Sequence, residues 1–231
     1  MAQNIAVIPA RGGSKRIPRK NIKNFLGTPM IGYSINLALS SGIFDRVIVS
    51  TDDEEISKIA IELGAEVPFV RDAKLADDLT PTLPVIRNTI QVLGVETTRE
   101  NLVCCIYPCA PFVTIKDLIV AKKLVQDYGE GFCYPVVEYA HPVQRAMKMN
   151  SEGLMSFFTP ENELKRTQDF ELSYHDAGQF YWGSTESWSV RTSLHSNSVG
   201  LPIPNWRVVD IDTPDDWVRA EKLYRTLFNS G

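Results

Sequence analysis

The sequence predicts an α/β protein built on a mostly parallel sheet. Short, nearly continuous β-branched runs alternate with segments whose apolar residues recur at helical spacing. Continuous apolar runs are typical of strands covered on both faces, and their alternation with helices indicates right-handed crossovers. The 231 residues are 44% hydrophobic and 23% charged, which suits a single domain over residues 1–231 with an ample core.

The elements follow each other along the chain in that rhythm. Strands are expected at 4–9, 46–51, 66–70, 102–107, 132–137, 178–183 and 207–212. Helical spacing is found at 31–39, 56–63, 82–93, 118–128, 185–192 and 217–227. Pro29 before the first helix and Gly42 after it are typical of a helix start and stop.

Two helix starts carry capping signals. Thr114 with Asp117 has the spacing of a capping box. Thr213 is followed by Pro214 at the first helical position and by Asp216 at the third. We therefore expect helices to begin directly after Thr114 and Thr213.

The rhythm stops between residues 138 and 174. Polar and apolar residues alternate in "VQRAMKMN" and "GLMSFF", and the charged stretch "PENELKRTQDFE" follows. This pattern predicts a hairpin outside the main sheet. Because an isolated hairpin is marginally stable in water, we expect the segment to pack on a second copy of the chain in a two-fold dimer.

The loop after the first strand, in "VIPARGGSKRIPRKN", is strongly basic although the chain has a net charge of -4. Its cations are Arg11, Lys15, Arg16, Arg19 and Lys20. Gly12 and Gly13 would let backbone amides approach an anion, and Ser14 adds a hydroxyl donor. Ligands bind beyond the carboxyl ends of parallel strands, so we interpret the loop as a triphosphate site. A solvated basic turn or a patch that touches nucleic acid remains the alternative for the loop alone.

A pair of carboxylates, Asp210 and Asp212, stands in "VVDID" near the end of the chain. Side chains two apart on a strand share a face, so both could reach one hard cation such as Mg²⁺. The alternative is a pair of solvated turn residues. The P-loop pattern is absent from the sequence, so ATPase-type hydrolysis is not indicated.

The remaining features bear on location and partners. No apolar stretch approaches the length of a membrane span, and the acidic balance argues against a surface that binds nucleic acid or anionic lipid. The four cysteines match no zinc spacing and lie in apolar surroundings. We expect a soluble cytoplasmic protein with reduced, buried thiols and no membrane or nucleic-acid partner.

These motifs resemble those of the CMP-sialic acid synthetases, also called acylneuraminate cytidylyltransferases. The resemblance covers nearly the whole chain and is carried by "IPARGGSKRIPRKN", "FDRVIVSTDD", "VRDAKLADD", "YPCAPF", "AGQFYW" and "DIDTPDD". The Arg-Ile-Pro-Arg loop and "DAGQFYW" are most similar to the pseudaminic acid branch. The resemblance implies the Rossmann-like nucleotide-diphosphosugar transferase fold, a homodimer, and Mg²⁺-dependent transfer of CMP from CTP to the anomeric hydroxyl of a nine-carbon 2-keto sugar acid, with release of pyrophosphate.

The resemblance also implies roles for individual residues. Nucleotide-binding positions are Ala10, Arg11, Gly12, Gly13, Ser14, Lys15, Lys20, Asn21, Arg71 and Asp78. Arg11 and Lys20 are expected at the α-phosphate, and Asp212 joins them as a catalytic residue while it shares the metal with Asp210. The sugar-binding positions are Tyr107, Gln179, Tyr181 and Arg166, and Phe180 and Asp176 would line the same pocket. A surface ion pair for Arg71, core packing for the aromatic residues and a solvated charge for Arg166 are the alternatives.

Tyr107 departs from the family pattern. Many members have Gln-Pro-Thr-Ser-Pro-Leu where this chain has "YPCAPF", so Tyr107 replaces a glutamine that faces the sugar. Together with Phe180, Tyr181 and Trp182, this change favours pseudaminic acid as the acceptor over N-acetylneuraminic acid. Legionaminic acid, another ulosonic acid, or a non-catalytic nucleotide- or RNA-binding role are the competing hypotheses.

Overall fold

The central sheet of the computed structural model, which describes residues 2–77 and 79–228, confirms the mostly parallel α/β prediction. Its strands lie in the order β11-β6-β10-β5-β1-β4, and β9 pairs with β6. They are β1 (Asn4–Pro9), β4 (Arg46–Ser50), β5 (Leu102–Ile106), β6 (Phe132–Glu138), β9 (Tyr174–Asp176), β10 (Phe180–Ser184) and β11 (Val199–Pro202). Parallel pairing joins β1 to β4 and β5, and β11 to β6, whereas β10 runs antiparallel to β5 and β6.

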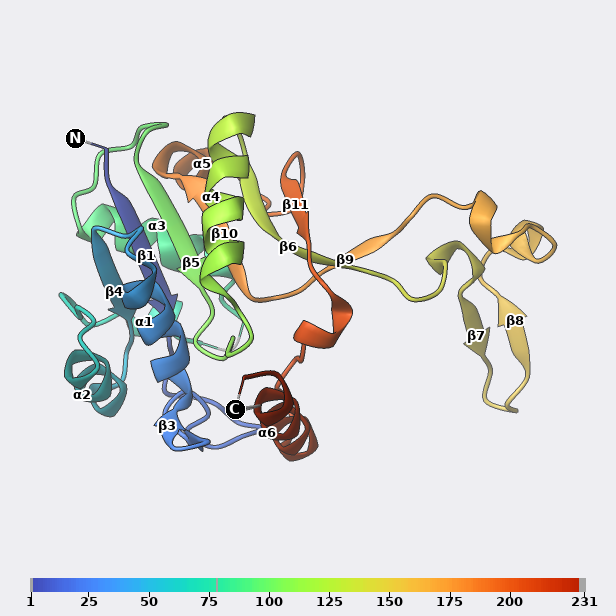
Figure 1. The fold of residues 1–231 in the computed structure, drawn as a ribbon, viewed down its shortest axis with the longest axis horizontal. Coiled ribbons are helices and arrows are strands. Elements are labelled where there is room, and N and C mark those ends of the chain that lie inside the picture. Colours follow the sequence, from blue (N-terminus) through green and yellow to red (C-terminus); the bar gives the residue numbers. More distant parts are fainter. Residues whose placement is uncertain (1, 78, 229–231) are drawn as a thin grey trace.

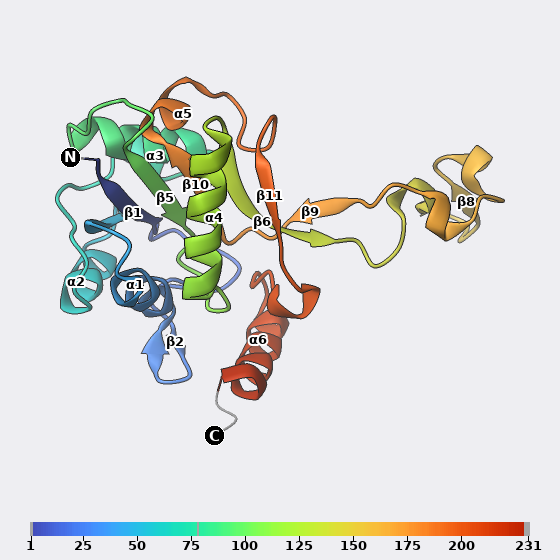
Figure 2. The ribbon, with the colours of Figure 1, turned by 45° about the horizontal axis from the view of Figure 1, so that its top comes forward.

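Helices cover both faces of this sheet, as Figures 1 and 2 show. One buried cluster joins the sheet to α1 (Met30–Ser41), α2 (Glu54–Glu62) and α4 (Ile115–Tyr128). A second cluster joins the opposite face to α3 (Thr82–Val92) and α5 (Thr185–Val190). Phe180 and Trp182 belong to the first cluster and Tyr181 to the second, as the alternation of neighbouring strand residues predicts.

The predicted helix caps are present. Pro29 is the N-cap of α1, and Gly42 closes that helix with φ 65, in the left-handed region that glycine adopts without strain. Thr114 and Asp117 form the reciprocal capping box at the start of α4. Thr213 accepts a hydrogen bond from the amide of Asp216 at 3.2 Å, at the start of α6 (Pro214–Phe228).

Two predicted strands are wrong, and two strands of the central sheet were missed. Residues 66–70 contribute isolated bridges at Glu66 and Val70, because Pro68 interrupts the ladder. Arg207 ends the short 3₁₀ turn Asn205–Arg207, and residues 208–212 are irregular and pair with no strand. The missed strands are β9, three residues that pair with the end of β6, and β11, a short edge strand whose glycine and proline hide its strand character.

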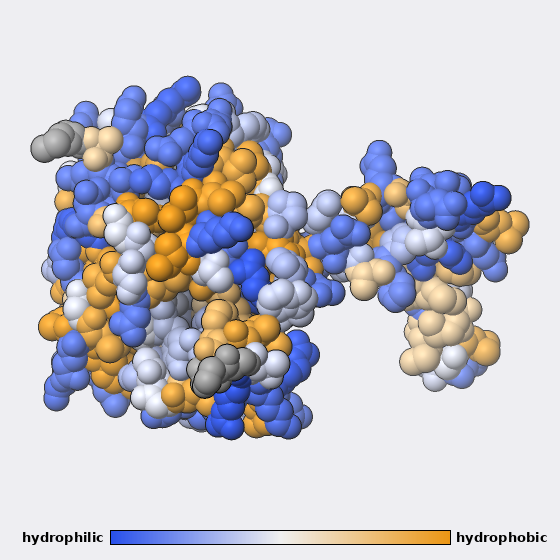
Figure 3. Space-filling model, viewed as in Figure 1, coloured by the Kyte–Doolittle hydropathy of each residue, from blue (hydrophilic) through white to orange (hydrophobic). Residues whose placement is uncertain are grey.

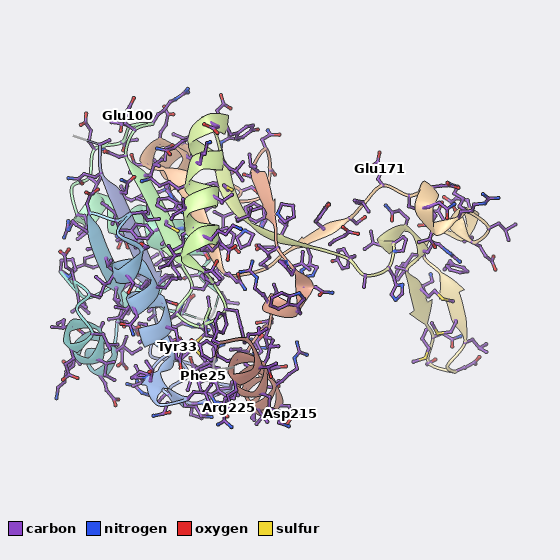
Figure 4. The ribbon with its side chains drawn as sticks, in the orientation of Figure 1. Phe25, Tyr33, Glu100, Glu171, Asp215 and Arg225 are labelled. Atoms are coloured by element: carbon purple, nitrogen blue, oxygen red, sulfur yellow. The ribbon has the colours of Figure 1, made fainter. Side chains whose placement is uncertain are left out.

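A third buried cluster fastens α6 below the sheet. The ring of Phe25, in the ribbon β2 (Asn24–Phe25) and β3 (Thr28–Pro29), lies edge-on to Tyr33 at 5.3 Å and to Trp217 of α6 at 5.4 Å. Figure 4 shows Phe25 and Tyr33 next to this helix. Ile211 is buried in the same cluster. The residues between β11 and α6 are therefore held against the carboxyl edge of the sheet.

Residues 138–174 form an arm that leaves the body between β6 and β9 (Figures 1 and 2). The arm holds the antiparallel hairpin β7 (Met147–Met149) and β8 (Met155–Phe157), which forms a sheet of its own. In the space-filling view the arm is separated from the body by a narrow neck, and apolar side chains gather on its hairpin (Figure 3). The hairpin thus lies outside the main sheet, as the sequence predicts. Within the described ranges, no helix combines the length and apolarity that a membrane crossing requires.

Candidate active site

A cleft of about 710 Å³ opens at the carboxyl edge of the sheet. It brings together most of the predicted site residues, although they are spread over two hundred positions of the chain. The predicted residues that line it are Arg11, Ser14, Lys15, Lys20, Asn21, Arg71, Tyr107, Gln179, Asp210 and Asp212. Predicted Asp78 lies outside the residues that the structure describes.

The sheet topology explains why these residues meet. The basic loop leaves the carboxyl end of β1, and Tyr107 leaves the carboxyl end of β5. Because β10 is antiparallel, it enters the sheet where its neighbours leave, and Phe180 pairs with Ile106. Gln179 therefore reaches the same edge just before β10 begins.

Several cations of the loop are paired within the chain. Arg19, whose φ is 55, donates to Asp53 at 2.5 Å and to Glu55 at 2.5 Å, away from the predicted phosphate site. Arg16 pairs with Asp212 at 2.7 Å. Lys20 Nζ donates to the carbonyl of Ile211 at 2.7 Å and lies 3.4 Å from Asp212. The loop and the acidic segment are thus joined directly, and Lys20 and Arg16 are the residues that join them.

The Gly12 amide is not open to an anion in the way that the sequence predicts. The Gly12 amide donates to Asp52 Oδ1 at 3.1 Å, and a Cβ at Gly12 would come within 2.5 Å of Asp53. Gly12 is therefore required by its close approach to these carboxylates, and its amide is already satisfied. A Cβ at Gly13 would meet open space. Ala10 is fully buried and donates its amide to Ser50, so it supports the loop from below.

Asn21 and Arg11 link the loop to its surroundings. Asn21 is 5% exposed and donates through Nδ2 to the carbonyl of Arg11 at 2.9 Å. It also accepts a hydrogen bond from the Cys109 thiol at 3.3 Å. The Arg11 guanidinium donates to the carbonyl of Asp77 at 2.8 Å, across the mouth of the cleft.

Arg71 is a buried cation at the base of the cleft. It is 5% exposed and donates through Nε to Ser50 Oγ at 3.1 Å and through Nη2 to the Ser50 carbonyl. Burial lowers its pKa to about 10, so it remains charged at neutral pH. The surface ion pair considered above is not observed: among the described residues, no carboxylate lies within ion-pair distance of Arg71. Such a cation is a suitable partner for a bound anion.

Asp210 and Asp212 both line the cleft, but from an irregular segment and not from a strand. Burial raises the pKa of Asp210, and the negative charge of Asp212 raises it further, while Lys20 and Arg16 act in the opposite direction. A cation bound between the two carboxylates would relieve their mutual repulsion, so the pair is suited to bind one. Within the described ranges, no set of three His, Cys, Asp or Glu side chains is arranged to hold a metal.

The predicted sugar-binding residues are placed differently from one another. Tyr107 Oη lies 2.7 Å from Thr82 Oγ1, and burial raises the pKa of Tyr107 to about 12. Gln179 donates to the carbonyl of Arg207 at 3.0 Å. Tyr181 is buried beneath the cleft and does not line it. Arg166 is exposed in the arm, apart from the cleft of its own chain.

Sequence reasoning missed a salt bridge that holds the acidic segment in place. Arg207 makes a bidentate pair with Asp117 of α4, at 2.7 and 3.0 Å. Burial alone would raise the pKa of Asp117, but the hydrogen bonds from Arg207 and Thr114 outweigh it and lower the pKa. The sequence marked Asp117 as a helix cap, and no local signal connected it to a residue 90 positions away.

A model of the family described as "Cytidylyltransferase" matches residues 5–192, which include the basic loop, Arg71 and the strands around the cleft. The chain belongs to the cytidylyltransferase family. The sequence-based prediction of a cytidylyltransferase is thereby confirmed. The family match ends before Asp210 and Asp212, so these residues are placed by the structure and not by the family model.

Relatives of this cytidylyltransferase cover the whole chain. It is 42% identical to a pseudaminic acid cytidylyltransferase of Campylobacter jejuni, over 99% of both chains. It is 28% identical to a CMP-N,N'-diacetyllegionaminic acid synthase of Legionella pneumophila, over 95% of both chains. A solved structure of a CMP:2-keto-3-deoxy-manno-octonic acid synthetase complexed with CTP aligns with a TM-score of 0.70 at 15% identity, over 97% of this chain and 99% of that chain. This last likeness concerns the fold alone, and it confirms the predicted Rossmann-like transferase fold.

Proposed function

We propose that the chain is a pseudaminic acid cytidylyltransferase, which transfers CMP from CTP to the anomeric hydroxyl of pseudaminic acid and releases pyrophosphate. The observation that carries the reaction class is the single cleft in which Lys20, Arg71 and Asp212 converge. The choice of acceptor rests on the similarity to the Campylobacter jejuni enzyme over its full length.

The reaction needs charge neutralisation and positioning more than covalent help from the protein. The oxygen of the sugar's anomeric hydroxyl bonds to the α-phosphorus of CTP and loses its proton to solvent, while the bond from that phosphorus to the oxygen that bridges the α- and β-phosphates breaks and pyrophosphate leaves. In our proposal Arg11 and Lys20 contact the α-phosphate, where charge develops, and Arg71 binds the nucleotide. Asn21 and Ser14 would orient the phosphates through their polar side chains.

The acidic pair fits a divalent cation. Asp210 and Asp212 line the same cleft and repel each other, and Mg²⁺ is usually bound by one or two carboxylates together with phosphate oxygens. We propose that these two residues hold Mg²⁺, which would neutralise part of the triphosphate charge. Arg16 and Lys20 contact the oxygens of Asp212 in the free protein, at 2.7 and 3.4 Å, so they hold that carboxylate in place at the cleft.

The proposed function is tested by pyrophosphate release from CTP with a panel of sugar acids. We expect turnover with pseudaminic acid and a preference over N-acetylneuraminic acid of at least about 10²-fold in kcat/KM, which is about 2.7 kcal/mol of differential transition-state binding. Equal efficiency with both acids, or a preference for N-acetylneuraminic or legionaminic acid, would overturn the acceptor. Absence of pyrophosphate release with every acid would overturn the reaction class.

We further propose that the protein is a two-fold homodimer assembled through the arm. The arm exposes large apolar side chains, and among the described residues its buried Gln144 Oε1 and Arg145 Nε atoms have no hydrogen-bond partner. Arg166 would then reach the sugar site of the second copy. Sedimentation velocity tests this proposal: a monodisperse, fully active monomer at working concentration would refute it. The cytoplasmic location stays a prediction.

A further inference from the structure

The cleft contains an acidic side chain, Asp176, that neither the nucleotide site nor the metal site uses. Asp176 lies at the end of β9, lines the cleft, and keeps its side chain 24% exposed. Hydrogen-bond donors converge on its carboxylate. Oδ2 accepts from Tyr181 Oη at 2.5 Å and from His195 Nε2 at 2.9 Å, and Oδ1 accepts from the amide of Gly178 at 2.8 Å.

The two side-chain donors are themselves held in place. Tyr181 is 3% exposed, and its ring packs against Tyr107 at 5.5 Å and Tyr134 at 5.6 Å. Burial raises the pKa of Tyr181, and the charge of Asp176 adds to this effect, so the phenol stays protonated and donates. The ring of His195, from the loop before β11, stands edge-on to Tyr134 at 5.2 Å.

Counting acceptor sites shows what Asp176 can still do. An ionised carboxylate accepts at about four lone-pair positions. Oδ2 is occupied by Tyr181 and His195, whereas the bond from Gly178 leaves room on Oδ1. A group in the cleft that meets this oxygen must donate a hydrogen, and an anionic group would be repelled.

The position of Asp176 in the sheet indicates which of the two substrates lies next to it. Asp176 comes just before β10, and β10 is separated from β1 by β5. Two strand spacings place this side of the cleft about 10 Å from the basic loop of β1. The triphosphate needs the cations of the loop, so the group next to Asp176 belongs to the acceptor.

We infer that Asp176 is a specificity-determining residue of the acceptor site, and that Tyr181 and His195 are positioning residues that direct its free acceptor position into the cleft. The recognised group is an N–H or O–H of the sugar acid, such as an acylamido N–H or a ring hydroxyl. The same carboxylate would orient the sugar, because the sugar's own carboxylate must lie away from it. This inference rests on the proposed function, since it assigns the acceptor half of the same cleft.

Asp176→Asn tests the first part, because it removes the charge at constant shape and replaces one acceptor oxygen by an NH₂ donor. We expect the KM for the sugar acid to rise about 10- to 100-fold, the usual range for a hydrogen bond to a charged group, with the KM for CTP unchanged. Asp127→Asn is the matched control: it changes the same charge on an exposed position of α4 and should leave both KM values unchanged.

His195→Ala and His195→Gln test the positioning role on a side chain that is 56% exposed and can be replaced without disturbing the core. We expect His195→Ala to raise the acceptor KM about 3- to 10-fold with little change in kcat, the effect of losing one hydrogen bond. His195→Gln keeps an N–H donor and should restore most of the affinity. A general loss of stability would move both variants together and would affect CTP as well.

The outcomes separate this inference from the proposed function. If the wild-type protein converts a sugar acid but Asp176→Asn keeps the same acceptor KM, the role of Asp176 is refuted and the function stands. If His195→Ala leaves the acceptor KM unchanged, the positioning role of His195 is refuted. If the wild-type protein converts no sugar acid while it still binds CTP, the proposed function fails, and the inference fails with it.

Discussion

The cleft and the arm differ in how far their side chains are satisfied by contacts within the chain. In the cleft, loop cations already have partners in the same chain, as Lys20 does with Asp212, and even buried Arg71 donates to Ser50. In the arm, large apolar side chains face solvent: Met149 is 68% exposed and Leu154 63%. The body is therefore organised by contacts within one chain, whereas the arm lacks a covering surface for its apolar side chains. Substitutions in the two regions should fail in different ways.

The largest effect is expected at Lys20. Lys20→Met removes a cation that we place at the α-phosphate, and loss of one such donor typically lowers kcat about 10²- to 10³-fold. The melting temperature should change little, because Lys20 makes one hydrogen bond to a backbone carbonyl and one long ion pair. Steady-state kinetics with saturating CTP measure the effect. Lys123→Met, on the exposed side of α4, is the control, and equal activity of the two variants would contradict the assignment.

A loss of stability is expected when the salt bridge behind the acidic segment is broken. The side chains of Arg207 and Asp117 are 13% and 12% exposed, so Arg207→Met leaves a mostly buried carboxylate without its partner. Breaking such a pair lowers the free energy of unfolding by about 3 kcal/mol. Arg99→Met is the control, since its pair with Glu186 is exposed and should contribute less than about 1 kcal/mol.

The pH dependence gives this prediction a second readout. Because the folded state lowers the pKa of Asp117, the stabilisation is present above the ordinary aspartate pKa of about 3.9 and is lost as the pH falls through the lower folded pKa. We therefore expect urea unfolding to show a smaller difference in the free energy of unfolding between wild type and Arg207→Met near pH 3 than at pH 7. A difference that stays constant over this range would indicate that packing, and not the ion pair, is responsible.

Substitutions in the arm should change the self-association of the protein and leave the folding of the body unchanged. Met149→Asp combined with Leu154→Asp places two charges on the apolar hairpin. Burial of such side chains contributes about 1.5–3 kcal/mol each, so the dissociation constant of the proposed dimer should rise at least about 10²-fold. Sedimentation measures this change, and urea unfolding of the body should be unaffected. Ile119→Asp, which replaces a residue of the body that is 47% exposed, should leave the association constant unchanged.

The same contrast explains what the sequence could predict. Local sequence signals were sufficient to predict β1, α1 and the capping box at Thr114, because each depends on residues within a few positions of one another. The basic loop could be placed at the site because parallel strands end at one edge. The arm could be recognised because its alternation has no helices beside it.

Other features depend on partners that no local pattern reveals. The Gly12 amide binds Asp52, and Arg207 pairs with Asp117 across 90 positions, so neither contact has a sequence signature. Tyr181 was expected to line the cleft, but the alternation of strand residues places its side chain in the buried cluster beneath the cleft, where it donates a hydrogen bond to Asp176. Sequence reasoning thus identified the right stretch, since Gln179 and Asp176 do line the cleft, but it missed that Tyr181 lies beneath it.

The smallest effect on activity is expected from thiol reagents, and it tests how well the body is closed. All four cysteines lie in the body, and the arm contains none. Cys109 is the one beside the cleft, where its thiol donates to Asn21, and burial raises its pKa to about 12. The thiolate is the reactive form, so at pH 8 Cys109 should be alkylated about 10³-fold more slowly than an ordinary cysteine with a pKa of about 8.5. Iodoacetamide labelling followed by intact-mass measurement should show four labels in urea and none in the native protein after the time that a free cysteine needs, with activity retained. Rapid labelling of Cys109 in the native protein, with loss of CTP binding, would instead mean that this side of the cleft opens in solution and exposes the thiol.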